Sequence, residues 1–170
     1  MQSYDPYELM MIPPNKKAEM IAIEINKKDN VNLSLVKDLI VLGANLDWQD
    51  RDGLAMLHYC TYHNHLEILR VLIDAGANLN IQDKFGRTAL HWCVSDNHPD
   101  IAKILLDAGV DVNIQAEGGW SVLHFCAFWN RIDIAKMFLE AGSDKTIPTL
   151  SGKLPYKLAE SIELRELLRV

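Results

Sequence analysis

The sequence has few of the features that mark a secreted or membrane-spanning chain. It holds three cysteines in 170 residues, which is too few for a disulfide framework and indicates a reducing compartment. No apolar run approaches the roughly 18–20 residues that span a bilayer. Residues 1–8 have neither the basic start nor the long apolar core of a secretion signal. We therefore expect a cytoplasmic or nuclear protein that is not exported through a signal peptide and does not insert into a membrane.

Positive charge is also scarce. The chain has 17 lysines and arginines against 23 aspartates and glutamates, a formal net charge of −6. A general binder of the phosphate backbone needs a clustered basic face, and docking on an anionic membrane surface needs juxtamembrane positive charge. The charge balance therefore argues against nucleic acid and anionic membranes as partners.

Motifs of catalysis are missing as well. The sequence contains no Gly-x-Ser-x-Gly, no His-Glu-x-x-His and no phosphate-binding loop. We therefore expect a protein that is not an enzyme and that uses no cofactor.

What the sequence does contain is internal repetition with a period of 33 residues. The repeated positions are glycines and Leu-His pairs: Gly53, Gly86, Gly119 and Gly152; Gly43, Gly76, Gly109 and Gly142; Leu57-His58, Leu90-His91 and Leu123-His124. A fixed period of about 20–50 residues is typical of stacked-repeat architectures.

The period divides the chain into an irregular arm and five units. The arm is residues 1–14, where apolar residues including Tyr4 are interrupted by Pro6, Pro13 and Pro14. We expect it to lie over the first unit, the alternative being a short peptide that docks on a partner. The repeat domain covers residues 15–170, with units of about 15–47, 48–80, 81–113, 114–146 and a closing cap at 147–170.

Hydrophobic periodicity predicts two short helices in each regular unit. The first helices are expected at 55–63, 88–96 and 121–129, and the second helices at 66–74, 99–107 and 132–140. The closing helix is expected from Ile162, about three residues earlier than the period requires. A short extended arm follows each second helix, as in 78–81 and 111–114.

One unit carries the motif most fully: Gly86-Arg-Thr-Ala-Leu-His, followed by Ile104-Leu-Leu-Asp-Ala-Gly-Val-Asp-Val-Asn. These segments resemble the ankyrin repeat, and the resemblance extends over about residues 30–170. It implies an all-α solenoid of stacked helix pairs with short β-hairpin-like fingers. Ankyrin arrays are, with few exceptions, protein-binding modules without chemistry of their own.

The repeated histidines and cysteines invite a metal-binding interpretation. They are His58, His91 and His124, and Cys60, Cys93 and Cys126. Equivalent residues of successive repeats lie roughly 8–10 Å apart, whereas zinc needs ligands at about 2.0–2.3 Å from one ion. We therefore predict no metal site. The resemblance implies that the histidines bond to turn backbone and tie neighbouring repeats, and the cysteines are expected to pack as small hydrophobes.

The resemblance also implies a concave contact face made of fingertips and first helices. The predicted partner-binding residues on it are Trp48, Arg51, Asp52, Leu54, Tyr62, His63, Lys84, Phe85, Arg87, Asp96, Glu117, Trp120, Phe128 and Trp129. Exposed aromatics with arginine are typical of binding hot spots, the alternative being that single rings fold back onto neighbouring helices. We expect Trp120, Phe128 and Trp129 to form the anchor, with the acidic members favouring a partner that has basic or hydrogen-bonding groups.

The functional expectation is an intracellular adaptor or inhibitor, monomeric, that binds another protein. The alternatives are a self-assembling or targeting subunit of a larger complex and a pathogen effector that binds a host protein. The resemblance also permits hydroxylation of Asn80 or Asn113.

Overall fold

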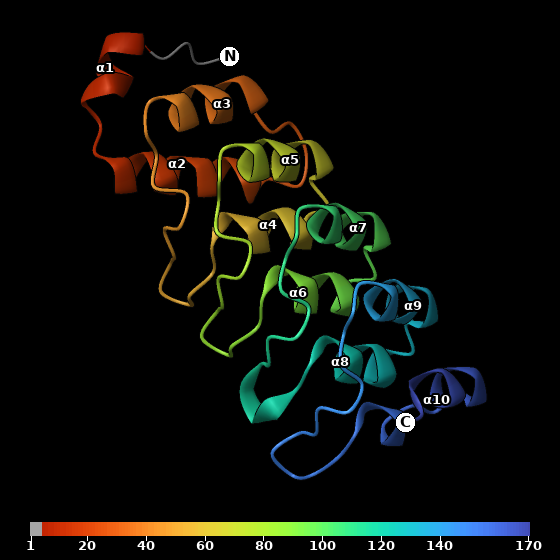
Figure 1. Ribbon diagram of the computed structural model, residues 1–170. Helices are drawn as coiled ribbons and strands as arrows, with labels where there is room; N and C mark the ends of the chain where they lie inside the picture. Colours follow the sequence, from red (N-terminus) through yellow and green to blue (C-terminus); the bar gives the residue numbers. More distant parts are fainter. Residues whose placement is uncertain (1–4) are drawn as a thin grey trace. The chain divides into compact units, whose positions relative to one another are not determined.

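The computed structural model describes residues 5–170 (Figure 1); Tyr4 of the predicted arm lies outside them. Within this range the chain has ten α-helices, two short 3-10 helices and no named strand, which confirms the all-α fold class. The elements form two compact units, one ending at Asn78 and the other beginning at Leu79.

The first unit contains five helices, α1 (Pro6–Met11), α2 (Pro14–Ile25), α3 (Leu33–Val41), α4 (Met56–Tyr62) and α5 (Leu66–Asp74). Helix α1 falls where an irregular arm was expected. Asp5 caps it by accepting the Tyr7 N–H at 2.9 Å, and a proline stands at the start of both α1 and α2. The missing N–H of proline costs least in the first turn of a helix, so here the prolines begin helices instead of preventing them.

A buried lysine joins the ends of α1 and α3. The Lys17 side chain donates from Nζ to the Leu42 carbonyl at 2.7 Å, just past α3, and to the Met10 carbonyl in α1 at 3.5 Å. Carbonyls at the end of a helix have no partner within the helix, so a lysine satisfies them here. The core of this unit is built from buried aliphatic side chains, among them Ile21, Ile25, Leu39, Leu57 and Leu69.

The second unit contains α6 (Ala89–Ser95), α7 (Pro99–Asp107), η1 (Glu117–Gly119), α8 (Val122–Trp129), α9 (Ile132–Glu140), η2 (Pro155–Lys157) and α10 (Ile162–Leu168). Helix α6 packs against α7 and α8, and α8 packs against α9. Leu90, Leu105, Leu123 and Phe138 fill the core between them and are fully buried.

Each finger is closed by the same backbone hydrogen bond, from the N–H of one residue to the carbonyl four residues later. The pairs are Asp50 and Leu54 (3.1 Å), Asp83 and Arg87 (2.9 Å), Ala116 and Trp120 (2.8 Å), and Thr149 and Lys153 (2.9 Å). In the second unit neighbouring tips are also linked, because the Glu117 N–H donates to Phe85 O and the Leu150 N–H donates to Gly118 O, both at 2.8 Å. The predicted hairpin character is thus limited to tight turns with isolated bridges at 49–55 and 116–120.

Candidate functional site

Two of the repeated histidines, His91 and His124, tie neighbouring repeats within the second unit, as predicted. His91 Nδ1 accepts the Thr88 N–H at 3.2 Å, and His124 Nδ1 accepts the Ser121 N–H at 3.1 Å. With Nδ1 accepting, the neutral ring carries its proton on Nε2, which donates to the carbonyl of Trp120 (3.3 Å) and of Lys153 (2.9 Å) respectively. Each histidine thereby fixes the start of its own helix to the next finger, and burial lowers the pKa of His124 so that it stays neutral.

The three cysteines are buried, and that burial raises the pKa of each thiol. A thiol that stays protonated is neither a good nucleophile nor a metal ligand. Over residues 5–170 no group of three or more His, Cys, Asp or Glu side chains is placed to hold a metal ion.

Aspartates lock two of the fingers. Asp83 Oδ1 accepts the N–H groups of Phe85 and Arg87, both at 2.9 Å, and its Oδ2 accepts from Arg87 Nε at 2.8 Å and Trp92 Nε1 at 3.1 Å. Burial alone would raise the pKa of Asp83, but these hydrogen bonds outweigh it and lower the pKa. The predicted site residue Arg87 is therefore held by its own finger, with its guanidinium over the rings of Phe85 and Trp92 at 5.0 and 4.5 Å.

The preceding finger has the same arrangement with a tyrosine. Asp50 Oδ2 accepts from Tyr59 Oη at 2.6 Å, and Oδ1 accepts the N–H groups of Asp52 and Leu54 at 2.8 and 2.9 Å. Tyr59 and Trp92, one repeat apart, thus brace their own fingers with their polar atoms.

The third finger lacks this lock. Ala116 stands where Asp83 stands one repeat earlier, and Phe125, which has no polar atom, replaces Trp92. Trp120 takes the place of Arg87, and its ring packs edge-on against Phe125 and Phe128 with centroids 5.6 and 5.7 Å apart. Phe128 contacts Trp129 in the same way at 5.1 Å. We call these four residues, Trp120, Phe125, Phe128 and Trp129, the aromatic cluster.

The aromatic cluster is open to solvent on one side. Phe128 is 57% exposed and Trp129 45% exposed, while Trp120 and Phe125 are half-buried. Edge-to-face contact is an arrangement that pairs of aromatic rings prefer. The structure therefore brings together the three rings expected to form an anchor and adds Phe125, which the predicted set lacked; the signal for it was Ala116 in register with Asp50 and Asp83.

The other predicted residues are distributed over both units. Exposed side chains are Arg51, Asp52, Tyr62, Lys84, Phe85 and Glu117, and half-buried ones are Trp48, Leu54, His63, Arg87 and Asp96. His63 is tied to the end of α2, because its Nε2 lies 3.0 Å from Asn26 Oδ1. Lys84 lies over the Phe85 ring at 5.1 Å.

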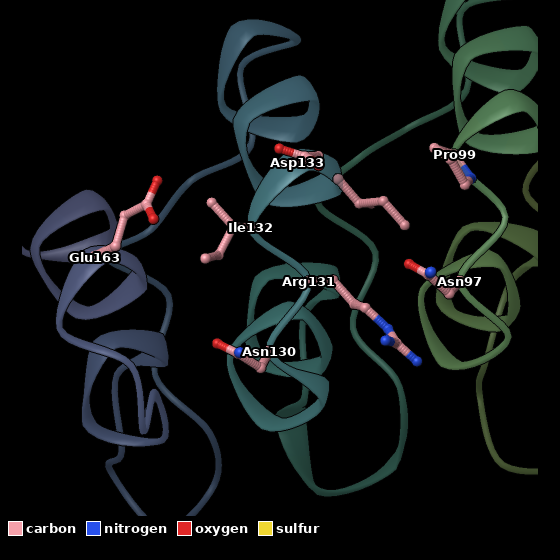
Figure 2. Close-up of a pocket in the computed structure, with 8 residues that line it drawn as sticks. Asn97, Pro99, Asn130, Arg131, Ile132, Asp133 and Glu163 are labelled. Carbon is pink, nitrogen blue, oxygen red and sulfur yellow. The ribbon is translucent and has the colours of Figure 1, made fainter.

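A hollow of about 390 Å³ lies where the turns between paired helices meet, lined by residues of α7, α9 and α10 and by Asn97, Asn130 and Arg131. Figure 2 shows Arg131 extending from the α8–α9 turn toward Asn97. Its guanidinium donates to the carbonyls of Val94 and Ser95 at 3.2 and 3.3 Å. A hollow of equal volume in the first unit is lined by Asn64, one period before Asn97, among other residues. Because the hollow recurs with the repeat, we attribute both to the stacking of helices and do not assign a ligand to either.

Two comparisons bear on the family. The family model described as ankyrin repeats (3 copies) matches residues 20–116, and the one described as ankyrin repeat matches residues 118–150. A comparison with curated proteins finds no match. None of the helices within residues 5–170 has the length and apolar character needed to cross a membrane.

Proposed function

Since the chain belongs to the ankyrin-repeat family, we propose that it is a non-catalytic adaptor or inhibitor that binds another protein through the aromatic cluster. Ankyrin repeats generally mediate protein–protein interaction. The fold alone does not choose a partner or a surface, so the placement of the site rests on the residues of this chain.

The observation that carries the proposal is the change between the second and third fingers. Asp83 binds the polar groups of Arg87 and Trp92. Ala116 cannot do so, and Trp120 packs instead against Phe125 and against the exposed ring of Phe128. Large rings at the centre of an interface contribute most of its binding energy. A contiguous exposed aromatic group on a soluble domain marks an interaction site.

The scaffold also holds these rings in place before binding. His124 fixes the first turn of α8 to the last finger, and the edge-to-face contacts restrain the rings relative to one another. Side chains that are already ordered lose little entropy on binding. The aromatic cluster therefore suits a partner that binds a rigid surface.

The proposal is tested by removing the two exposed rings. Affinity purification with mass spectrometry from the source cells should recover a partner with the wild-type chain and lose it with the Phe128→Ala/Trp129→Ala double variant. Loss of a hot-spot ring weakens binding by about 2 kcal/mol or more, roughly 30-fold. We chose these rings because Trp120 and Phe125 also support the fold.

The matched control is Val41→Ala on α3, an exposed apolar side chain outside the aromatic cluster. It should keep the partner, and all variants should keep the helical circular dichroism of the wild type. If the double variant retains the partner, the binding site lies outside the aromatic cluster. If sedimentation shows that the wild type self-associates and the double variant is monomeric, the protein is a self-assembling subunit and not an adaptor.

A further inference from the structure

Resting on this proposed function, we infer that the partner anchors itself with a cationic side chain, arginine above all, held between the Asp96 carboxylate and the Trp129 ring. The occupant is a basic segment of another protein. Four features of the second unit point to this cation.

The first feature is that Asp96 and Trp129 stand at the same end of two neighbouring helices. Asp96 is the C-cap of α6 and Trp129 is the last residue of α8, so they occupy equivalent places one period apart. Helices α6 and α8 pack side by side, and packed helices lie roughly 8–10 Å apart. The bonds from Arg131 to Val94 and Ser95 fasten the end of α6 to the turn that follows Trp129.

The second feature is that the Asp96 carboxylate is compensated only in part: the charges of His98, Arg87 and Arg131 act on it, but no hydrogen bond reaches its Oδ2 within residues 5–170. The side chain is half-buried, and this Oδ2 is shielded from solvent. The two nearby arginines are engaged elsewhere, Arg131 on the backbone carbonyls of α6 and Arg87 on Asp83 at 2.8 Å. A shielded polar atom without a partner destabilises a fold, and a cation that binds the exposed part of the same carboxylate offsets some of that cost.

The third feature is a precedent within the same unit. The Arg87 guanidinium pairs with Asp83 at 2.8 Å and lies over the Trp92 ring at 4.5 Å. A cation between a carboxylate and an indole gains an ion pair and a cation–π contact together. Asp96 and Trp129 present the same two groups with the arginine missing, and a partner supplies it.

The fourth feature is the charge around the aromatic cluster. Glu117 is exposed at the fingertip before Trp120, and the whole chain carries a net charge of −6. A chain with this net charge repels phosphate groups and attracts a basic segment. Arginine suits the site better than lysine because its planar guanidinium stacks on a ring while bonding a carboxylate.

The test begins with a random peptide library displayed on phage and selected against the purified full chain. The enriched peptides should share an arginine or lysine next to apolar residues. The affinity of the strongest peptide, measured by fluorescence anisotropy, should fall about 10- to 100-fold in Asp96→Asn, as expected for a lost hydrogen bond to a charged group. Glu140→Gln, which makes the same change in net charge on α9, should bind as the wild type does.

A double-mutant cycle then isolates the pair. Replacing the arginine of the peptide by glutamine should weaken binding to the wild type at least as much as Asp96→Asn does, because it also removes the cation–π contact with Trp129. The two changes together should cost little more than the change in the peptide alone. Enriched peptides without a basic residue, or arginine peptides that Asp96→Asn binds unchanged, would overturn the inference.

The outcomes separate this inference from the proposed function. If Trp129→Ala weakens peptide binding and Asp96→Asn does not, the cation site is refuted and the aromatic cluster remains the binding surface. Peptides indifferent to Trp129→Ala, or a selection that enriches nothing, refute both. If the wild type is a dimer and Trp129→Ala makes it a monomer, the surface binds a second copy of the chain and not a basic segment of another protein.

Discussion

At the scale of single residues, the electrostatic environment of Asp96 is opposite to that of Asp50 and Asp83. Asp50 and Asp83 accept several hydrogen bonds within their fingers, and these outweigh burial and lower the pKa of each. Burial raises the pKa of Asp96, and His98, Arg87 and Arg131 offset this only in part. The folded protein therefore favours the charged form of Asp50 and Asp83 and disfavours the charged form of Asp96.

This contrast predicts that Asp96→Asn raises the melting temperature at pH 7. A carboxyl group whose folded pKa is raised favours folding only below its unfolded pKa of about 3.9 and loses that benefit as the pH rises through the folded pKa. Removing the charge at pH 7 therefore restores stability, and the gain should vanish below about pH 4. Thermal unfolding followed by circular dichroism measures both.

Asp83→Asn is the matched control, and it should lower the melting temperature at pH 7 because Asp83 pairs with Arg87. An Asp96→Asn variant less stable than the wild type at pH 7 would show that the carboxylate stabilises the fold, which would weaken its assignment to a partner.

At the scale of elements, the fingers depend on close backbone contact. Gly119 and Gly142 both have positive φ, +78° and +87°, a conformation that costs a residue with a Cβ about 1–2 kcal/mol. A Cβ on Gly142 would meet nothing within 4 Å, whereas one on Gly119 would lie 2.8 Å from the Leu150 nitrogen. That nitrogen donates the bond that joins the third and fourth fingers.

Gly142→Ala should therefore lower the free energy of unfolding by about 1–2 kcal/mol, and Gly119→Ala should add about 1–3 kcal/mol of overpacking to that loss. Urea denaturation of the two variants measures the difference. If both variants lose the same free energy of unfolding, the third and fourth fingertips can move apart to accommodate the methyl group that Gly119→Ala adds without loss of stability.

Much of the helical framework could be predicted because the same pattern recurs in phase. The second helices at 66–74, 99–107 and 132–140 were predicted to the residue, since a repeated glycine fixes each end. Helix α1 was missed because proline breaks a helix in its interior but favours its first turn. The bonds of Tyr59 and Trp92 to their own fingers depend on an aspartate nine residues earlier, which a count of aromatics does not reveal.

The binding surface was less predictable than the helices. Which cations are already engaged is a property of three-dimensional contacts: the sequence placed Asp96 among acidic site residues but gave no sign that Arg131 bonds to α6 backbone. The sequence did contain the register of Asp50, Asp83 and Ala116, from which the missing hydrogen bonds of the third finger follow once those of the other two are known.

At the scale of the whole molecule, the folded chain holds some histidines neutral and some aspartates charged. Burial lowers the pKa of His124, and for His63 burial with His65 and Lys28 nearby lowers the pKa as well. Unfolding restores ordinary pKa values, about 6.5 for histidine and 3.9 for aspartate. Acid should therefore destabilise the protein in two separate ranges of pH.

In the first range, below about pH 6.5, the unfolded chain binds protons that folded His124 and His63 do not, so stability falls with pH until their lowered folded pKa values are reached. In the second range, below about pH 4, protonation of Asp50 and Asp83 removes the stability that their lowered pKa values provide. Melting temperatures from pH 8 to pH 3 should fall in two steps, and His124→Asn should reduce the first step while leaving the second. A single decline confined to pH below 4 would mean that His124 and His63 take up protons as readily in the folded protein as in the unfolded chain.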